Sequence, residues 1–206
     1  MNRIAAALFV CAGILPLGVC AGTGRSGPGR AVEPAPAPVA DRAQSPSTGI
    51  EAWKEELEAI TGGVWIASNA AYAEADGVDE YGMEFTLEPG GLSATGCLWG
   101  DREGELVAVF WRMFQAWDPT RNAGLFYQSH AAGIVGMGYL EDRGPDEPHL
   151  VQDFRDPDGT MRRVGHFERW EGPDRRISRS VDWSGSEWTP RREYTWVRVP
   201  NRTSRC

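Results

Sequence analysis

Lysine is nearly absent from this chain, and so are the short motifs that mark common catalytic centres. Lys54 is the only lysine among 206 residues, which leaves little basis for Schiff-base chemistry. The sequence contains no G-x-S-x-G, C-x-x-C or H-E-x-x-H pattern, which argues against a serine hydrolase, a redox dithiol and a helical zinc site. It therefore predicts no catalytic residue, and an enzyme is the less favoured interpretation.

Basic residues are also outnumbered by acidic residues, 21 against 29. The formal net charge is −8. The first 49 residues contribute +2, so the region from residue 50 onward carries −10. A surface this acidic repels phosphate backbones, and nucleic acid is not an expected partner.

The first 21 residues have the features of an export signal. Arg3 provides a positive start, residues 4–15 are apolar, and Val19 and Ala21 place small residues before a cut after Ala21. The apolar run is too short to span a membrane. We therefore predict a signal peptide and a secreted or periplasmic protein.

A lipoprotein signal is the alternative for the same segment. Cys20 follows Leu-Gly-Val, although Val19 is unfavourable before a lipidated cysteine. We expect contact with a membrane only if Cys20 carries a lipid.

Residues 22–49 are rich in Pro, Gly, Ala and Ser and have almost no large apolar side chains. Such a segment buries too little surface to offset its ordering entropy, so it is predicted to be a disordered linker. Residues 50–206 are long enough to form one domain with its own hydrophobic core.

The domain is predicted to begin with one short helix and to continue as strands. Ile50, Trp53, Leu57 and Ile60 follow a helical spacing, which ends at Gly62. From there the period of apolar residues changes from 3.6 to 2, as in M-E-F-T-L-E at 83–88.

Turn sequences rich in Gly, Pro and Asp then recur about every ten residues. This spacing predicts an all-β fold, an antiparallel up-and-down barrel of about 8–10 strands, because closure removes exposed edges. Asp156-Pro-Asp-Gly fits a hairpin turn better than a calcium loop, since position 167, where the loop would need an acid, is Phe.

Gly63-Val-Trp65 opens the first predicted strand and resembles the G-x-W signature of lipocalins and other calycin-type barrels. The chain is also similar, over about residues 50–200, to uncharacterised lipocalin-like domains secreted by bacteria. This resemblance implies that Trp65 seals one end of the barrel and that Arg198, in the last strand, stacks on it. It implies no particular activity.

One predicted strand, E-L-V-A-V-F-W-R-M-F-Q-A-W at 105–117, is apolar on both faces. Strict alternation places Phe110 with Arg112 on one face and Trp111 with Met113 on the other. We expect the helix at 50–60 to cover the outer face, with a dimer interface as the alternative.

A barrel with nine tryptophans has a suitable interior for a small apolar or amphipathic ligand, where Arg beside aromatic rings would bind an anionic head. The residues expected to contact this ligand are Trp99, Trp111, Arg112, Tyr127, His166 and Trp196. Two alternatives remain, namely a haem- or metal-dependent barrel enzyme and a structural envelope protein with a filled barrel.

Histidine and cysteine complete the candidate residues. No cofactor is predicted, but His130 or His166 would be the ligand if haem or a metal were bound. Cys97 and Cys206 either form a disulfide in an oxidising compartment or remain a buried and a terminal free thiol.

Overall fold

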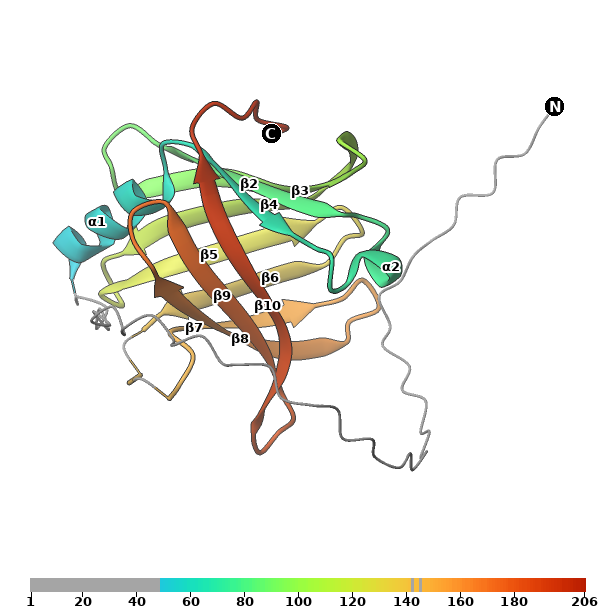
Figure 1. Ribbon diagram of the computed structural model, residues 1–206. Helices are drawn as coiled ribbons and strands as arrows, with labels where there is room; N and C mark the ends of the chain where they lie inside the picture. Colours follow the sequence, from blue (N-terminus) through green and yellow to red (C-terminus); the bar gives the residue numbers. More distant parts are fainter. Residues whose placement is uncertain (1–48, 142, 145) are drawn as a thin grey trace, which may run out of the picture. The chain divides into compact units, whose positions relative to one another are not determined.

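The computed structural model describes residues 49–141, 143–144 and 146–206 (Figure 1). The predicted signal peptide, both candidate cleavage sites and linker residues 22–48 lie outside these ranges. No helix in the described part of the chain is long and apolar enough to cross a membrane.

The described residues form two helices and ten strands. In chain order these are α1 (Ile50–Ile60), β1 (Val64–Ser68), α2 (Ala73–Asp76), β2 (Glu80–Leu87), β3 (Ser93–Arg102), β4 (Glu105–Asp118), β5 (Ala123–His130), β6 (Val135–Leu140), β7 (Leu150–Arg155), β8 (Met161–Trp170), β9 (Arg175–Trp183) and β10 (Trp188–Val199).

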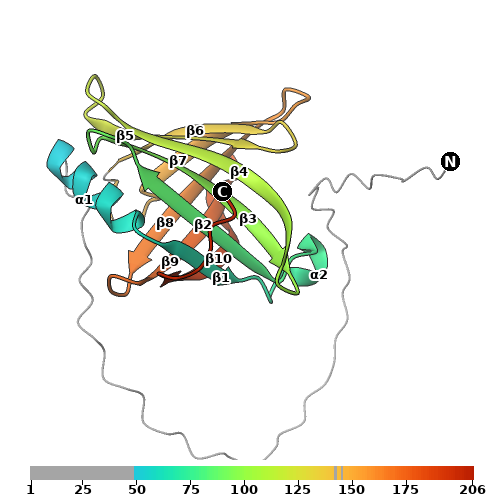
Figure 2. The ribbon, with the colours of Figure 1, turned by 90° about the horizontal axis from the view of Figure 1, so that it is seen from above.

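Each strand pairs antiparallel with its neighbours in sequence, and β1 also pairs with β10, so the sheet closes into a barrel (Figure 2). The closing pair aligns Val64 with Val199 and Trp65 with Arg198. This confirms the predicted all-β, up-and-down barrel. Asp156 to Gly159 lie in the turn of the β7–β8 hairpin.

Strand register separates the inner face from the outer face, because cross-strand partners point to the same side of a sheet. One set of partners runs Trp65, Met83, Leu98, Trp111 and His130, and includes members of the buried core cluster. This set faces inward. The set one residue along faces outward and consists of Val64, Glu84, Cys97, Arg112, Ser129, Val135, Arg155 and Met161.

Helix α1 closes one end of the barrel rather than covering β4, so the predicted position of the helix is wrong. Trp53, Leu57 and Ile60 are buried in the same core cluster as Trp65. The Trp53 ring lies against Gly124 of β5, where a Cβ atom would be only 2.2 Å from it. On β4 itself, Leu106 and Phe114 remain exposed.

A β-bulge in β4 also overturns the strict alternation predicted for this strand. Leu98 pairs with Trp111 but Trp99 pairs with Val109, so Phe110 is the extra residue. The bulge turns Phe110 inward, where its ring lies 6.1 Å from that of Tyr81, while Arg112 stays outside.

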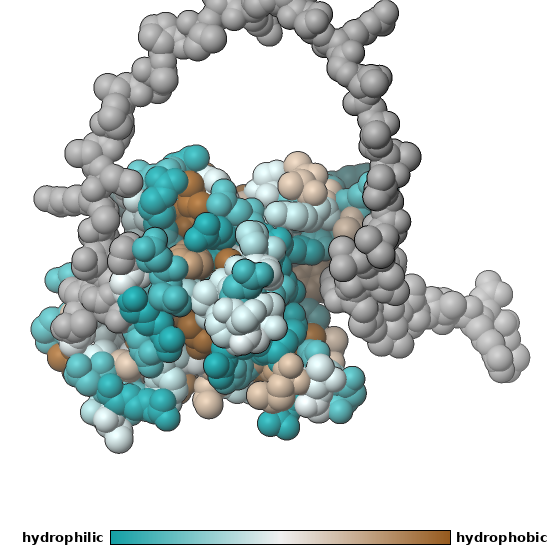
Figure 3. Space-filling model, turned by 90° about the horizontal axis from the view of Figure 1, so that it is seen from below, coloured by the Kyte–Doolittle hydropathy of each residue, from teal (hydrophilic) through white to brown (hydrophobic). Residues whose placement is uncertain are grey.

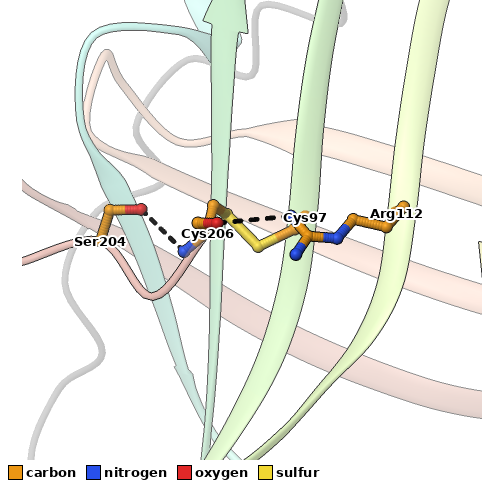
Figure 4. Close-up of a disulfide and its surroundings, with 4 residues drawn as sticks. All are labelled: Cys97, Arg112, Ser204 and Cys206. Atoms are coloured by element: carbon orange, nitrogen blue, oxygen red, sulfur yellow. Dashed lines mark hydrogen bonds between the residues drawn. A yellow bond between two sulfur atoms is a disulfide. The ribbon is translucent and has the colours of Figure 1, made fainter. Parts of the chain in front are cut away.

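The seven residues after β10 run along the outside of the barrel over β3. Cys206 forms a disulfide with Cys97 (Figure 4). Arg202 donates a hydrogen bond of 3.1 Å to Asp101. These two contacts flank Trp99 on the outer face of β3, and Trp99 has no exposed surface. The C-terminal segment therefore covers Trp99, and of the two alternatives for Cys97 and Cys206 the disulfide is present.

Loss of this disulfide should destabilise the barrel measurably, because it closes a loop with a sequence separation of 109. We expect Cys206→Ala to lower the free energy of unfolding by about 2–4 kcal/mol in urea titrations. Reductant should lower the stability of the wild type to the same level and leave the variant unchanged. Equal stability of the oxidised wild type and the variant would contradict this prediction.

Candidate functional site in the barrel interior

Trp65 is the centre of the closed end. It is fully buried, and its Nε1 donates a hydrogen bond of 2.9 Å to the carbonyl oxygen of Ile60 in α1. The Arg198 guanidinium lies 4.5 Å from the Trp65 ring centroid. A Cβ atom at Gly63 would come within 3.1 Å of the Arg198 side chain, so glycine at this position gives the arginine room to cross.

A second arginine, Arg176 on β9, approaches the same ring from the barrel interior. Its guanidinium lies 4.9 Å from the Trp65 centroid and 5.6 Å from that of Trp170. Arg176 Nη1 donates hydrogen bonds of 3.1 and 3.3 Å to the two carboxylate oxygens of Glu168 on β8. This ion pair belongs to the inner wall, since Trp170 pairs with Arg176 and Glu168 pairs with Ser178.

Helix α1 contributes a second carboxyl group near this ion pair. Glu56 lies on the same helical stripe as Trp53, Leu57 and Ile60, which all face the barrel. Burial and the negative charge of Glu168 raise the pKa of Glu56 to about 7, although Arg176 opposes the shift. Glu56 was not among the predicted residues. Its place on an apolar helical stripe is visible in the sequence, but only packing shows that its side chain faces the barrel.

The groups around Glu168 respond to burial in different ways. Burial acts to raise the pKa of Glu168, but Arg176 together with His149 and His166 holds that pKa below its usual value. Burial lowers the pKa of His166 to about 4, so this imidazole is neutral at pH 7. His166 Nε2 is buried and has no hydrogen-bond partner among the described residues.

The interior carries both aromatic and polar side chains. Along β4 to β7 its aromatic side chains include Trp111, Phe126 and Phe154, joined by the hydrogen-bonded pair Gln128–Gln152. Along β8 and β9, Val164 and Trp170 face inward, and so do four polar residues, namely His166, Glu168, Ser178 and Ser180. These four are only partly buried, and the Glu168 side chain keeps 25% of its surface accessible.

The end of the barrel near α2 is held by a separate polar network. Arg192 of β10 forms a two-point ion pair with Asp76 of α2, and Asp76 also accepts hydrogen bonds from Tyr81 and Asn69. Burial acts to raise the pKa of Asp76, but these three partners lower it overall. The network fixes α2 to the barrel, and the Asp76 carboxylate balances the charge of Arg192.

The structure places three of the six predicted ligand residues on the inner face and three outside. Trp111, His166 and Trp196 face the interior. Trp99 is covered by the C-terminal segment, and Arg112 donates to the carbonyl oxygen of Cys206. Tyr127 pairs with Phe114 and Met137 on the exposed side. These last three assignments are corrected, because strand register places all three residues on the outer face.

The outer face is polar on one side of the molecule, whereas Phe114, Tyr127 and Met137 are exposed apolar neighbours on β4, β5 and β6. Figure 3 shows one side of the molecule, where hydrophilic residues dominate and apolar residues form only small separate spots. Several outward arginines pair with acids, as Arg163 does with Asp153 at 2.7 Å. Arginines near the C-terminus also pair with acids from the first strands, as in the contact between Arg202 and Glu80.

The three histidines lie in different settings. His130 is at the end of β5 between the rings of Phe110 and Trp111, and its Nδ1 accepts a hydrogen bond from the Ala132 amide. His149 Nδ1 accepts from the Glu168 amide, so only His149 and His166 share the surroundings of Glu168. Within the described ranges, no group of three His, Cys, Asp or Glu side chains is placed to hold a metal ion.

No known protein-family model matches this sequence. No curated protein matches it either. The closed antiparallel barrel is compatible with the lipocalin-like architecture that Gly63, Trp65 and Arg198 suggest.

The raised pKa of Glu56 predicts a loss of stability as the pH rises. The carboxyl titrates near 4.5 in the unfolded chain and at about 7 in the folded barrel, so the folded state holds the proton more tightly. The free energy of unfolding should therefore fall between pH 5 and pH 8, by up to about 3 kcal/mol from this group.

Glu56→Gln should remove this contribution and make the protein more stable than the wild type at pH 8, measured by urea unfolding. Glu55→Gln, at the exposed neighbouring position, serves as the matched control and should leave the pH dependence unchanged. Identical pH profiles for Glu56→Gln and the wild type would contradict the assignment.

Proposed function

We propose that the protein is an exported, lipocalin-like barrel that binds a small apolar or amphipathic molecule in its interior. The combination of aromatic and polar side chains on the inner face carries this proposal. A ligand of this kind could place its apolar part against Trp111, Phe126 and Phe154, and its polar part against β8 and β9. Pockets for small molecules commonly combine an apolar lining with a few polar groups that fix orientation.

Partial accessibility of inward side chains also supports binding rather than a filled barrel. A close-packed core leaves its side chains without exposed surface. Here Glu168, His166, Ser178 and Ser180 all retain some. The filled barrel of a structural envelope protein is the competing function.

Binding can be tested with N-phenyl-1-naphthylamine, a neutral apolar probe whose fluorescence rises in an apolar site. We expect saturable binding to the wild type and at least about tenfold weaker binding to Ser180→Phe, because the new ring would fill the inner wall. Ser129→Phe adds the same ring to the outer face and should bind like the wild type. Circular dichroism checks that both variants fold, and no saturable binding by the wild type would refute the proposal.

The proposed export has its own test in the N-terminus of the mature protein. Mass spectrometry of protein from the envelope or medium should find a chain beginning at Gly22. A chain beginning at Cys20 with a diacylglycerol mass would instead establish the lipoprotein alternative. An intact Met1 terminus in most of the protein would contradict export.

A further inference from the structure

We infer that the interior site selects a neutral ligand with a hydroxyl group, which donates a hydrogen bond to Glu168 and accepts one from the inner wall beside it. This inference rests on the proposed function and adds the chemical class of the polar group. It replaces the expectation of an anionic head at the closed end, for reasons that follow from the contacts of the charges there.

The inward arginines near the closed end already have partners. Arg176 is bound by Glu168, and its side chain is only 5% accessible. Arg198 donates to the carbonyl oxygens of Ala59, Thr61 and Pro173. An anionic head group would have to break one of these buried contacts, which costs more than an exposed ion pair would return.

Glu168 is the charged group that a ligand would meet. Its accessible fraction of 25% is five times that of its partner Arg176. Its carboxylate oxygens accept hydrogen bonds, so the ligand must supply a donor. A carboxylate head would instead be repelled by the Glu168 charge.

Two buried side-chain nitrogen atoms beside Glu168 make no hydrogen bond to the described residues. Arg176 Nε and His166 Nε2 have no hydrogen-bond partner within the described chain. Register places His166 two residues before Glu168 on the inner face of β8, and Arg176 diagonally across on β9. Arg176 Nε can only donate a hydrogen bond, so the ligand must supply an acceptor.

A hydroxyl group both donates and accepts, and it brings no charge. Neutrality matters because Glu168 and Arg176 already balance each other. A cationic head would satisfy Glu168 but would add an unbalanced charge beside Arg176 and leave its Nε without an acceptor. The neutral imidazole of His166 is equally suited to a hydroxyl.

Four ligands of matched size test the inference by displacing the naphthylamine probe from the wild type at pH 7.4. They are 1-decanol, its ether isomer 1-methoxynonane, decanoate and decylammonium. We expect 1-decanol to bind at least about tenfold more tightly than each of the others, since only it can donate and accept without a charge.

The variant Glu168→Gln should bind 1-decanol about tenfold more weakly and the ether within about threefold of the wild type. Glu84→Gln, on the outer face of β2, is the matched control and should keep the preference for the alcohol. The comparison of ligands on the wild type needs no variant, so it stands even if Glu168→Gln does not fold.

Equal affinity for the alcohol and the ether would overturn the inference, because the donor would then have no role. Tighter binding of decanoate or decylammonium, or failure of all four to displace a bound probe, would also overturn it while leaving the proposed binding function intact. If neither the probe nor any of the four binds the wild type, the proposed function itself fails.

Discussion

Antiparallel hydrogen bonds between β1 and β10 close the sheet into a barrel, and this closure creates the interior. Once Val64 is aligned with Val199, the register of the other nine strand pairs determines which side chains point inward. A slip of one residue would exchange the two faces and place Glu168 and Arg176 in solvent. The stack of Trp65 with Arg198, which are partners in the closing pair, adds a specific side-chain contact where the two ends of the sheet meet.

Buried charges in this barrel occur with partners that lie on other strands or helices. Arg176 binds Glu168 across one hairpin, Arg192 ties β10 to α2, and Arg198 ties β10 to the end of α1. An isolated buried charge would be very costly, so each arginine also fixes the element that carries its partner. The same pairing determines the chemistry of the interior, because a bound arginine has little capacity left for an anionic ligand.

The fold was predictable from local sequence, whereas the site was predictable only in part. Two-residue periodicity and regular turn signals depend on neighbouring residues, so the barrel and the helix at 50–60 could be predicted. The bulge at Phe110 and the covering of Trp99 depend on pairing between strands and on a distant disulfide. Glu56 was missed because an acid on a helix normally faces solvent, and only tertiary packing shows that it faces the barrel.

The unpaired atoms beside Glu168 are hard to explain by stability alone. A buried polar atom without a partner costs about 1–3 kcal/mol, and folded proteins contain few of them. Other buried atoms of the inner face also lack a partner among the described residues, as Gln152 Nε2 does, although Gln128 donates to Gln152 and Trp196 donates to Ser178. Departures from local rules concentrate at functional sites, where a ligand completes what the protein leaves open. Arg176 Nε and His166 Nε2 flank the accessible Glu168 carboxylate. Together the three groups form a site whose open hydrogen bonds a ligand hydroxyl group would satisfy.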